Sequence, residues 1–428
     1  MGAEEKKAAT ELAELLRLLG LEGKREIELE DVELTVGELI LDPSALASAA
    51  LKAVAPPKMK TVAPPAPLAP PKVKPTTILE APFTPFVQEY PGQIREATLG
   101  ATKSEGGSRG KTVVIGGANT PAFYLFEKAP PHPPVIAIDT FDMKVRLPKA
   151  IKMYVEEFWG DPAAWAKIAV DKWGADLITV HLLSTDPLIK DTPPAEAAKT
   201  VEEVLQAVDV PLIIGGCGDP KKDAEVFMKV AEVAEGERVL LSSLTLDMGD
   251  VGSLEGVAKA AGKYGHLVLA FTALDLNRAK ELNRKLYDYV PKDRILMDLT
   301  TAALGYGLEY SFTIHERARM AALMGDTELQ HPILAGTTNA WAARETWMKL
   351  GPEWEPRRLR GPLWETTTAL ALLLAGVDVF MMMHPDAIKT MREVTQQLAS
   401  RGKADPNKIA NWVNARIKGE DEHDREGS

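Results

Sequence analysis

The stretch VIAIDTFD at residues 135–142 is a short apolar run that ends in polar residues, and a helix-patterned segment follows it. The chain repeats this pattern eight times, with starts roughly 25–45 residues apart, as the strand–helix units of a (β/α)8 barrel require. The eight runs cover residues 135–142, 176–183, 211–219, 239–245, 267–274, 295–301, 332–339 and 377–384. We therefore predict an α/β protein built on a (β/α)8, or TIM, barrel.

The rest of the 428-residue chain divides around this barrel, which we place at residues 78–400 with its eight units at 135–399. A leucine stripe at helical spacing and a short alternating stretch predict a small N-terminal α+β module at 1–54. Residues 55–77 are dominated by proline and alanine, the composition of an extended linker. Residues 401–428 predict a helix and a disordered tail.

Two short apolar stretches precede the first barrel strand and flank a Gly-Ala-Asn turn. Together, at residues 111–127, they predict a hairpin that closes the bottom of the barrel.

The composition excludes several classes of function. With a net charge of −11 and a pI near 5.3, the chain lacks the basic face that nucleic-acid binding needs. No apolar run reaches the roughly 18 residues of a membrane span, and the start AEEKKAATELAELL lacks the order of a signal peptide, so we expect a cytoplasmic protein. A single cysteine, Cys217, excludes internal disulfides and an iron-sulfur cluster held by this chain alone.

The functional candidates lie at the carboxyl ends of the predicted strands, because barrel active sites form there. Hydroxyl and amide groups outnumber acids and bases at these ends, which favours binding of a large polar ligand over proton transfer or covalent catalysis. No phosphate-loop, zinc-protease or serine-hydrolase motif is present. We predict no catalytic residue and no metal ligand, and a binding set of Asp139, Asp142, His181, Gly218, Asp298, Thr300, Thr301, Thr337, Thr338, Asn339, Met383 and His384.

Most of these residues also have a structural interpretation. Asp139 and Asp142 either anchor a ligand or cap the turns that follow their strand. His181 and His384 are either donors to a ligand or hydrogen-bonded scaffold. Met383 either fills the barrel wall or makes a soft contact with a flat macrocycle.

Long segments of the chain closely resemble the small, or delta, subunit of the corrinoid iron-sulfur protein in the CO dehydrogenase/acetyl-CoA synthase system. The resemblance spans residues 76–399, and residues 1–75 lie outside it. It is carried by MDLTTAALGYGLEYSF at 297–312, HPILAGTTNAWAARETWM at 331–348 and LRGPLWETTTALALLLAGVDVFMMMHP at 359–385, and it is extended by DPAAWAKIAVDKWGADLITVHLLSTDP at 161–187 and VPLIIGGCGDPKKDAEVF at 210–227.

The resemblance implies a barrel paired with a large, or gamma, subunit that holds an iron-sulfur cluster and most of a cobamide. The cobamide is expected between the two subunits, facing the barrel mouth. Its cobalt takes a methyl group from a methyl-tetrahydropterin methyltransferase and delivers it to acetyl-CoA synthase in the reductive acetyl-CoA (Wood–Ljungdahl) pathway. CO dehydrogenase is a further candidate partner, and the small subunit itself makes no bond.

Two other interpretations stay open. Pterin-binding methyltransferases use related barrels in which Asp and Asn side chains at strand ends bind the pterin, and Asp139, Asp298 and Asn339 fit that pattern. Alternatively, the barrel only organises the complex and does not touch the cofactor.

Overall fold

The computed structural model describes residues 88–122 and 130–399, so the predicted N-terminal module, linker and C-terminal helix lie outside the described residues. Eight parallel strands form one sheet in the order β8-β7-β6-β5-β4-β3-β10-β9, and a bridge between Met297 and Ile333 brings the two edge strands together. Each predicted run contains one strand, which confirms the (β/α)8 barrel. The strands are β3 Val135–Phe141, β4 Leu177–His181, β5 Leu212–Gly215, β6 Leu240–Leu244, β7 Leu267–Phe271, β8 Ile295–Asp298, β9 Leu334–Gly336 and β10 Val379–Met382.

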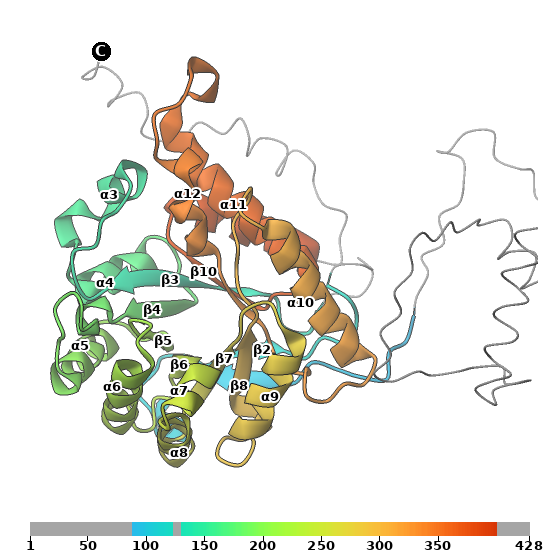
Figure 1. Ribbon diagram of the computed structural model, residues 1–428. Helices are drawn as coiled ribbons and strands as arrows, with labels where there is room; N and C mark the ends of the chain where they lie inside the picture. The colour runs from blue at the N-terminus through green and yellow to red at the C-terminus, as the bar shows by residue number, and fades with distance from the viewer. Residues whose placement is uncertain (1–87, 123–129, 400–428) are drawn as a thin grey trace, which may run out of the picture. The chain divides into compact units, whose positions relative to one another are not determined.

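Helices follow the strands in turn and cover the outside of the barrel (Figure 1). They are α3 Lys149–Val155, α4 Pro162–Asp171, α5 Pro194–Ala207, α6 Pro220–Val233, α7 Leu246–Asp250, α8 Leu254–Tyr264, α9 Leu276–Leu286, α10 Leu308–Leu323, α11 Arg357–Ala375 and α12 Pro385–Ala399. Short 3-10 helices occur at Lys103–Glu105, Glu156–Phe158, Leu183–Thr185, Lys292–Arg294, Thr337–Ala342, Arg344–Thr346 and Pro352–Trp354. Within the described ranges, no helix has the length and apolarity needed to cross a bilayer.

Local sequence sets where several of these helices begin. The side chains of Asp161, Asp219 and Asp275 accept hydrogen bonds from first-turn N–H groups of α4, α6 and α9. Pro162 and Pro220 are the first residues of α4 and α6. Proline is well suited to this position, because the N–H that it lacks would have no partner within the helix.

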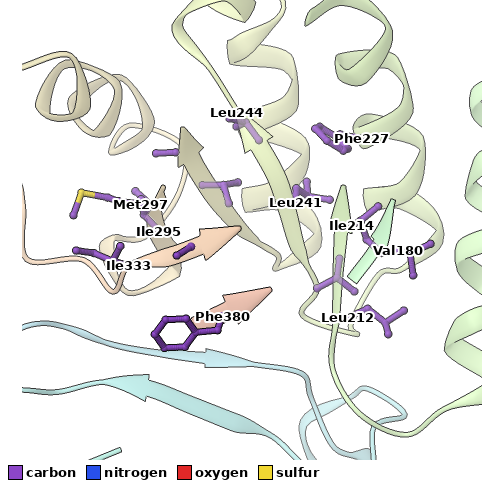
Figure 2. Packing of buried hydrophobic residues seen from close by; sticks show 14 of the residues in the cluster. Val180, Leu212, Ile214, Phe227, Leu241, Leu244, Ile295, Met297, Ile333 and Phe380 are labelled. Atoms are coloured by element: carbon purple, nitrogen blue, oxygen red, sulfur yellow. The ribbon is translucent and has the colours of Figure 1, made fainter. Parts of the chain in front are cut away.

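The alternation of side chains along each strand produces two apolar layers. One layer packs between the barrel and its helices, and Figure 2 shows Ile214 and Leu241 of this layer together with Phe227 of α6. The other fills the barrel interior and includes Ala137, Leu177 and Leu296. Two residues further along their strands, Asp139, Thr179 and Asp298 therefore belong to the inward-facing rows, towards the carboxyl ends of the strands.

A two-stranded antiparallel sheet contributes to the interior layer. It pairs β1 Glu96–Leu99 with β2 Val113–Gly116, and Leu99 and Ile115 join the interior cluster. The hairpin predicted at 111–127 did not include β1 as a neighbour of residues 113–116, because a local turn signal cannot reveal a strand that lies further back in the chain. Residues 123–127 of that prediction lie outside the described residues.

Candidate functional site

The carboxyl ends of the barrel strands bring several predicted residues together at what we call the mouth. On the β3–β4 side, Asp139 is 1% exposed, and its Oδ2 accepts a hydrogen bond of 2.6 Å from Thr338 Oγ1. Its Oδ1 lies 3.3 Å from His181 Nε2 but has no hydrogen-bond partner among the described residues. The His181 ring stacks on Phe141 at 5.2 Å between centroids. Three predicted residues from strands far apart in sequence therefore form one cluster.

The β7–β8 side of the mouth is organised around Asp298. Its Oδ1 accepts a 2.8 Å hydrogen bond from the Thr300 amide, whereas Oδ2 has no partner in the described part of the chain. Burial raises the pKa of Asp298 to about 7, and the Thr300 hydrogen bond opposes that shift only in part. Asp298 therefore changes charge near neutral pH.

Thr300 adopts a backbone conformation that β-branched residues rarely accept, with φ at +81°. Such a conformation costs about 1–3 kcal/mol and persists only when its surroundings hold it. Here the Thr300 amide bonds Asp298, its Oγ1 donates to the Thr272 carbonyl at 3.1 Å, and its carbonyl accepts from Ser311 Oγ at 3.0 Å. These bonds fix the position of the Asp298 carboxyl group.

Two buried hydroxyl groups belong to residues that follow the same two strands, Thr272 after β7 and Thr301 after β8. Thr272 and Thr301 are 4% and 6% exposed, and neither Oγ1 atom has a hydrogen-bond partner in the described structure. Asn339 is exposed, and its Nδ2 donates to the Thr301 carbonyl at 3.0 Å, which ties the end of β9 to the end of β8. This side of the mouth thus holds polar atoms whose hydrogen-bonding capacity is unused.

Other predicted binding residues already take part in the scaffold. Asp142 accepts hydrogen bonds from the amide and hydroxyl of Ser184, and it holds the loop after β4. Thr337 is fully buried, with its hydroxyl bonded to the Met381 carbonyl at 2.7 Å. The Gly218 amide donates to Asp223 Oδ2 at 2.9 Å. Their hydrogen bonds hold the loops around the mouth.

Cys217 belongs to the same scaffold. Its amide and its thiol both donate to Asp223 Oδ1, at 2.7 and 3.2 Å. Burial raises the pKa of the Cys217 thiol to about 11, so the thiol is protonated at neutral pH and is a poor nucleophile.

The sequence interpretation missed a central residue of the mouth, Glu365 on α11. It is fully buried and accepts hydrogen bonds from the Met383 amide at 2.6 Å, the His384 amide at 3.1 Å and Trp341 Nε1 at 3.0 Å. Burial raises the pKa of Glu365 to about 8, against the effect of these three donors. The available signal was a lone carboxylate before the apolar stretch TTTALALLLA.

His384 and Met383 are held by this glutamate rather than displayed at the surface. His384 is 1% exposed and stacks on Trp341 with 5.7 Å between ring centroids, and burial lowers the pKa of its imidazole to about 3. Met383 is 3% exposed and packs in an apolar cluster with Phe141 and Trp341. Both residues form the wall under the mouth, and His384 is neutral.

Comparison with known proteins shows which family this chain belongs to. The family model for the CO dehydrogenase/acetyl-CoA synthase delta subunit matches residues 96–395. The chain belongs to this delta-subunit family. This confirms the family resemblance that the sequence segments predict.

Curated relatives agree with the family model over most of their length. The acetyl-CoA decarbonylase/synthase complex subunit delta of Archaeoglobus fulgidus is 52% identical over 371 residues, which cover 83% of this chain and 80% of that protein. The subunit of the same name from Methanopyrus kandleri is 44% identical over 415 residues, or 93% and 96% of the two chains.

Among solved structures, a dihydropteroate synthase of Xanthomonas albilineans aligns with 63% of this chain and 94% of its own, at 16% identity and a TM-score of 0.43. At that score the likeness carries no weight for function.

Exposed apolar side chains surround the mouth of this delta-family barrel. Most lie on the segments that lead from a strand to the next helix, while Met153 lies in α3 and Tyr310 in the first turn of α10. The most exposed is Leu188, at 94%. The set comprises Met153, Leu188, Ile189, Val251, Leu274, Tyr306, Tyr310, Trp347 and Trp354, which we call the apolar ring. Exposed apolar groups gathered on one face are typical of a protein or ligand interface.

A cavity of about 660 Å³ lies away from the mouth. Its lining includes Asp209, which precedes β5, and Arg109. The Arg109 guanidinium is engaged with Glu237 Oε2 at 2.7 Å and the Val208 carbonyl at 2.6 Å, so it fastens this end of the barrel. The candidate site is therefore the mouth, where the unused polar atoms lie.

Proposed function

We propose that this chain is the small, non-catalytic subunit of a corrinoid iron-sulfur protein, and that its mouth forms one wall of a cobamide site shared with the large subunit. One observation carries the proposal. Polar atoms without partners lie inside the mouth, and the apolar ring lies around it. A buried polar atom without a partner costs roughly 1–3 kcal/mol, so this arrangement suits a ligand that supplies hydrogen bonds and a partner that covers the ring.

The residues at the mouth fit the edge of a cobamide rather than its cobalt. A corrin ring carries amide side chains that both donate and accept hydrogen bonds, as Asp298, Thr272 and Thr301 require. Among the described residues, no three His, Cys, Asp or Glu side chains come together as a metal site. When bound, the cobamide supplies a cobalt that carries the methyl group, while this chain binds the ring edge and excludes water.

The described residues also support a non-catalytic role. His384 is enclosed and neutral, the Cys217 thiol is protonated, and both oxygens of Glu365 accept hydrogen bonds. The chemistry then belongs to the partners: the large subunit, a methyl-tetrahydropterin methyltransferase, acetyl-CoA synthase and the associated CO dehydrogenase.

Ligand titration separates this role from that of a pterin-binding methyltransferase. We expect the purified full chain to show no saturable binding of methyl-tetrahydropterin by calorimetry at millimolar pterin. Combined with its large subunit, it should retain cobamide through gel filtration, followed by corrinoid absorbance. Tight pterin binding by the isolated chain, or cobamide retention by the large subunit that is equal with and without this chain, contradicts the proposal.

A further inference from the structure

We infer that a basic segment directly after β3 is a docking surface for the acidic face of a protein that binds the complex transiently. The basic segment is KVRLPKAIK at residues 144–152, and it ends within α3 Lys149–Val155. Four of its nine side chains are cationic and none is anionic, in a chain with a net charge of −11. The inference deepens the proposed function and rests on it for the identity of the partners.

Three of the four cations are exposed and lack a counterion. Lys144, Arg146 and Lys149 are exposed, and none of them forms an ion pair within the described residues. The fourth, Lys152, pairs with Glu156 at 3.4 Å. Unpaired cations gathered on one short segment make this part of the surface locally positive.

The indole ring of Trp159 brings two of the cations together. Lys144 Nζ and Lys152 Nζ lie 5.9 and 4.6 Å from the centroid of this one ring. The ring attracts each ammonium group, while the two ammonium groups repel each other. A carboxylate that approaches them relieves this repulsion, so the arrangement favours an anionic partner.

The basic segment is anchored to the barrel. Ile151 and Val155 of α3 are buried in the apolar cluster that contains Trp165. A Cβ at Gly160 would lie 2.8 Å from Lys144 Cγ, so the backbone there passes close to the Lys144 stem. Figure 1 shows α3 at the periphery of the barrel, apart from α4. A surface that is already held in shape loses little conformational freedom when a partner binds.

The position of the basic segment favours a partner other than the large subunit. Met153, a member of the apolar ring, directly follows Lys152 in α3. An apolar surface suits the lasting contact with the large subunit, whereas exposed charges act mainly on the rate of association. A protein docked on the basic segment would therefore lie beside the large subunit, at the rim of the mouth.

The rest of the chain limits the kind of anion that can dock. Glu156 and Glu157 are exposed directly after α3, and the whole chain is acidic. An extended polyanion such as duplex DNA would be repelled by these surroundings. A folded protein can confine its carboxylates to a patch that matches the basic segment, so an acidic protein face is the partner that fits.

Charge reversal tests the inference in the assembled complex. The full chain is combined with its cobamide-loaded large subunit, and biolayer interferometry follows the association of the methyltransferase and of acetyl-CoA synthase. In the triple variant Lys144→Glu/Arg146→Glu/Lys149→Glu, we expect the association rate constant of at least one enzyme to fall about tenfold at low salt, and its dissociation rate constant to change less than about twofold. Raising the salt from about 25 to about 250 mM should remove most of this difference.

A second triple variant controls for net charge. Lys172→Glu/Lys199→Glu/Arg278→Glu gives the chain the same net charge, and it changes exposed cations on other parts of the barrel. It should leave both association rate constants within about twofold of wild type, because the altered charges lie away from the docking surface. Circular dichroism melting checks the folding of both triple variants.

Several outcomes would overturn the inference and leave the proposed function standing. These are equal rates for the two triple variants, no association of either enzyme with the wild-type complex, and slower assembly with the large subunit while both enzymes are unaffected. Saturable wild-type binding to a DNA duplex or to phosphatidylglycerol vesicles that only the first triple variant loses would also overturn it. Failure of the wild-type complex to retain cobamide contradicts the proposed function alone, and the same rates measured on the full chain by itself then decide the inference.

Discussion

Replacing Glu365 with alanine should lower the free energy of unfolding by roughly 4–6 kcal/mol, since buried donors lose their acceptor and a cavity is left. The Met383 and His384 amides and Trp341 Nε1 all donate to this one carboxylate. These three groups have no other acceptor in the described structure. The loop after β9 and the end of β10 would lose their common attachment.

Urea denaturation measures this effect. Glu365→Gln keeps one acceptor oxygen but turns an N–H towards a donor, so we expect about half the loss shown by the alanine variant. Glu353→Ala, which removes an exposed carboxylate between β9 and α11, is the control and should stay within about 0.5 kcal/mol of wild type. A loss below 1 kcal/mol in Glu365→Ala would mean that Glu365 does not hold the mouth together.

Replacing Arg319 with leucine should destabilise the barrel by about 3–5 kcal/mol, because it leaves a buried carboxylate without its cation. Arg319 and Asp378 are 4% and 6% exposed, and Arg319 Nη2 lies 3.2 Å from Asp378 Oδ1. The same nitrogen donates to the Gly376 carbonyl, and Asp378 Oδ2 accepts from the Ile333 amide at 2.9 Å. The pair therefore joins α10 to the beginning of β10 and to the strand beside it.

Comparison with an exposed ion pair isolates the effect of burial. Lys259 and Glu255 form such a pair on α8 at 2.6 Å, so Lys259→Leu should cost less than about 1 kcal/mol in the same urea experiment. The double variant Arg319→Leu/Asp378→Leu should recover part of the loss seen in Arg319→Leu, since no unpaired charge remains. Equal losses in the buried and exposed variants would show that the Arg319 pair is not desolvated.

The eight strands could be predicted from sequence because each is a short apolar run at regular spacing, and their order in a closed parallel barrel follows from the chain. The pairing of β1 with β2 could not be predicted from sequence, because two strands that are far apart in the chain leave no local signal of their pairing. Among the site residues, Asp298, Thr300 and Thr301 lie at the end of β8, as their strand-end position predicts, and their part in binding stays a prediction. Strand-end position could not show that the hydroxyl of Thr337 is already bonded to a backbone carbonyl.

Two features of the mouth depend on tertiary structure alone. Glu365 lies on a helix, and only the packing of α11 against the end of β10 makes it an acceptor for the strand-end amides. The apolar ring consists of ordinary side chains such as Leu188 and Trp347, which could equally have been core residues from their sequence context. Their exposure became a signal only once the fold placed them on one face.

Hydrogen exchange gives the most direct test of the claim that the mouth is a wall of a shared cobamide site. Amide exchange of the full chain is compared alone and in complex with its cobamide-loaded large subunit. We predict slower exchange in the complex at residues 186–191, 300–310 and 344–356, which carry parts of the apolar ring and of the mouth, and unchanged exchange at α8 Leu254–Tyr264. Protection confined to other faces of the barrel, with these three segments unchanged, would contradict the account.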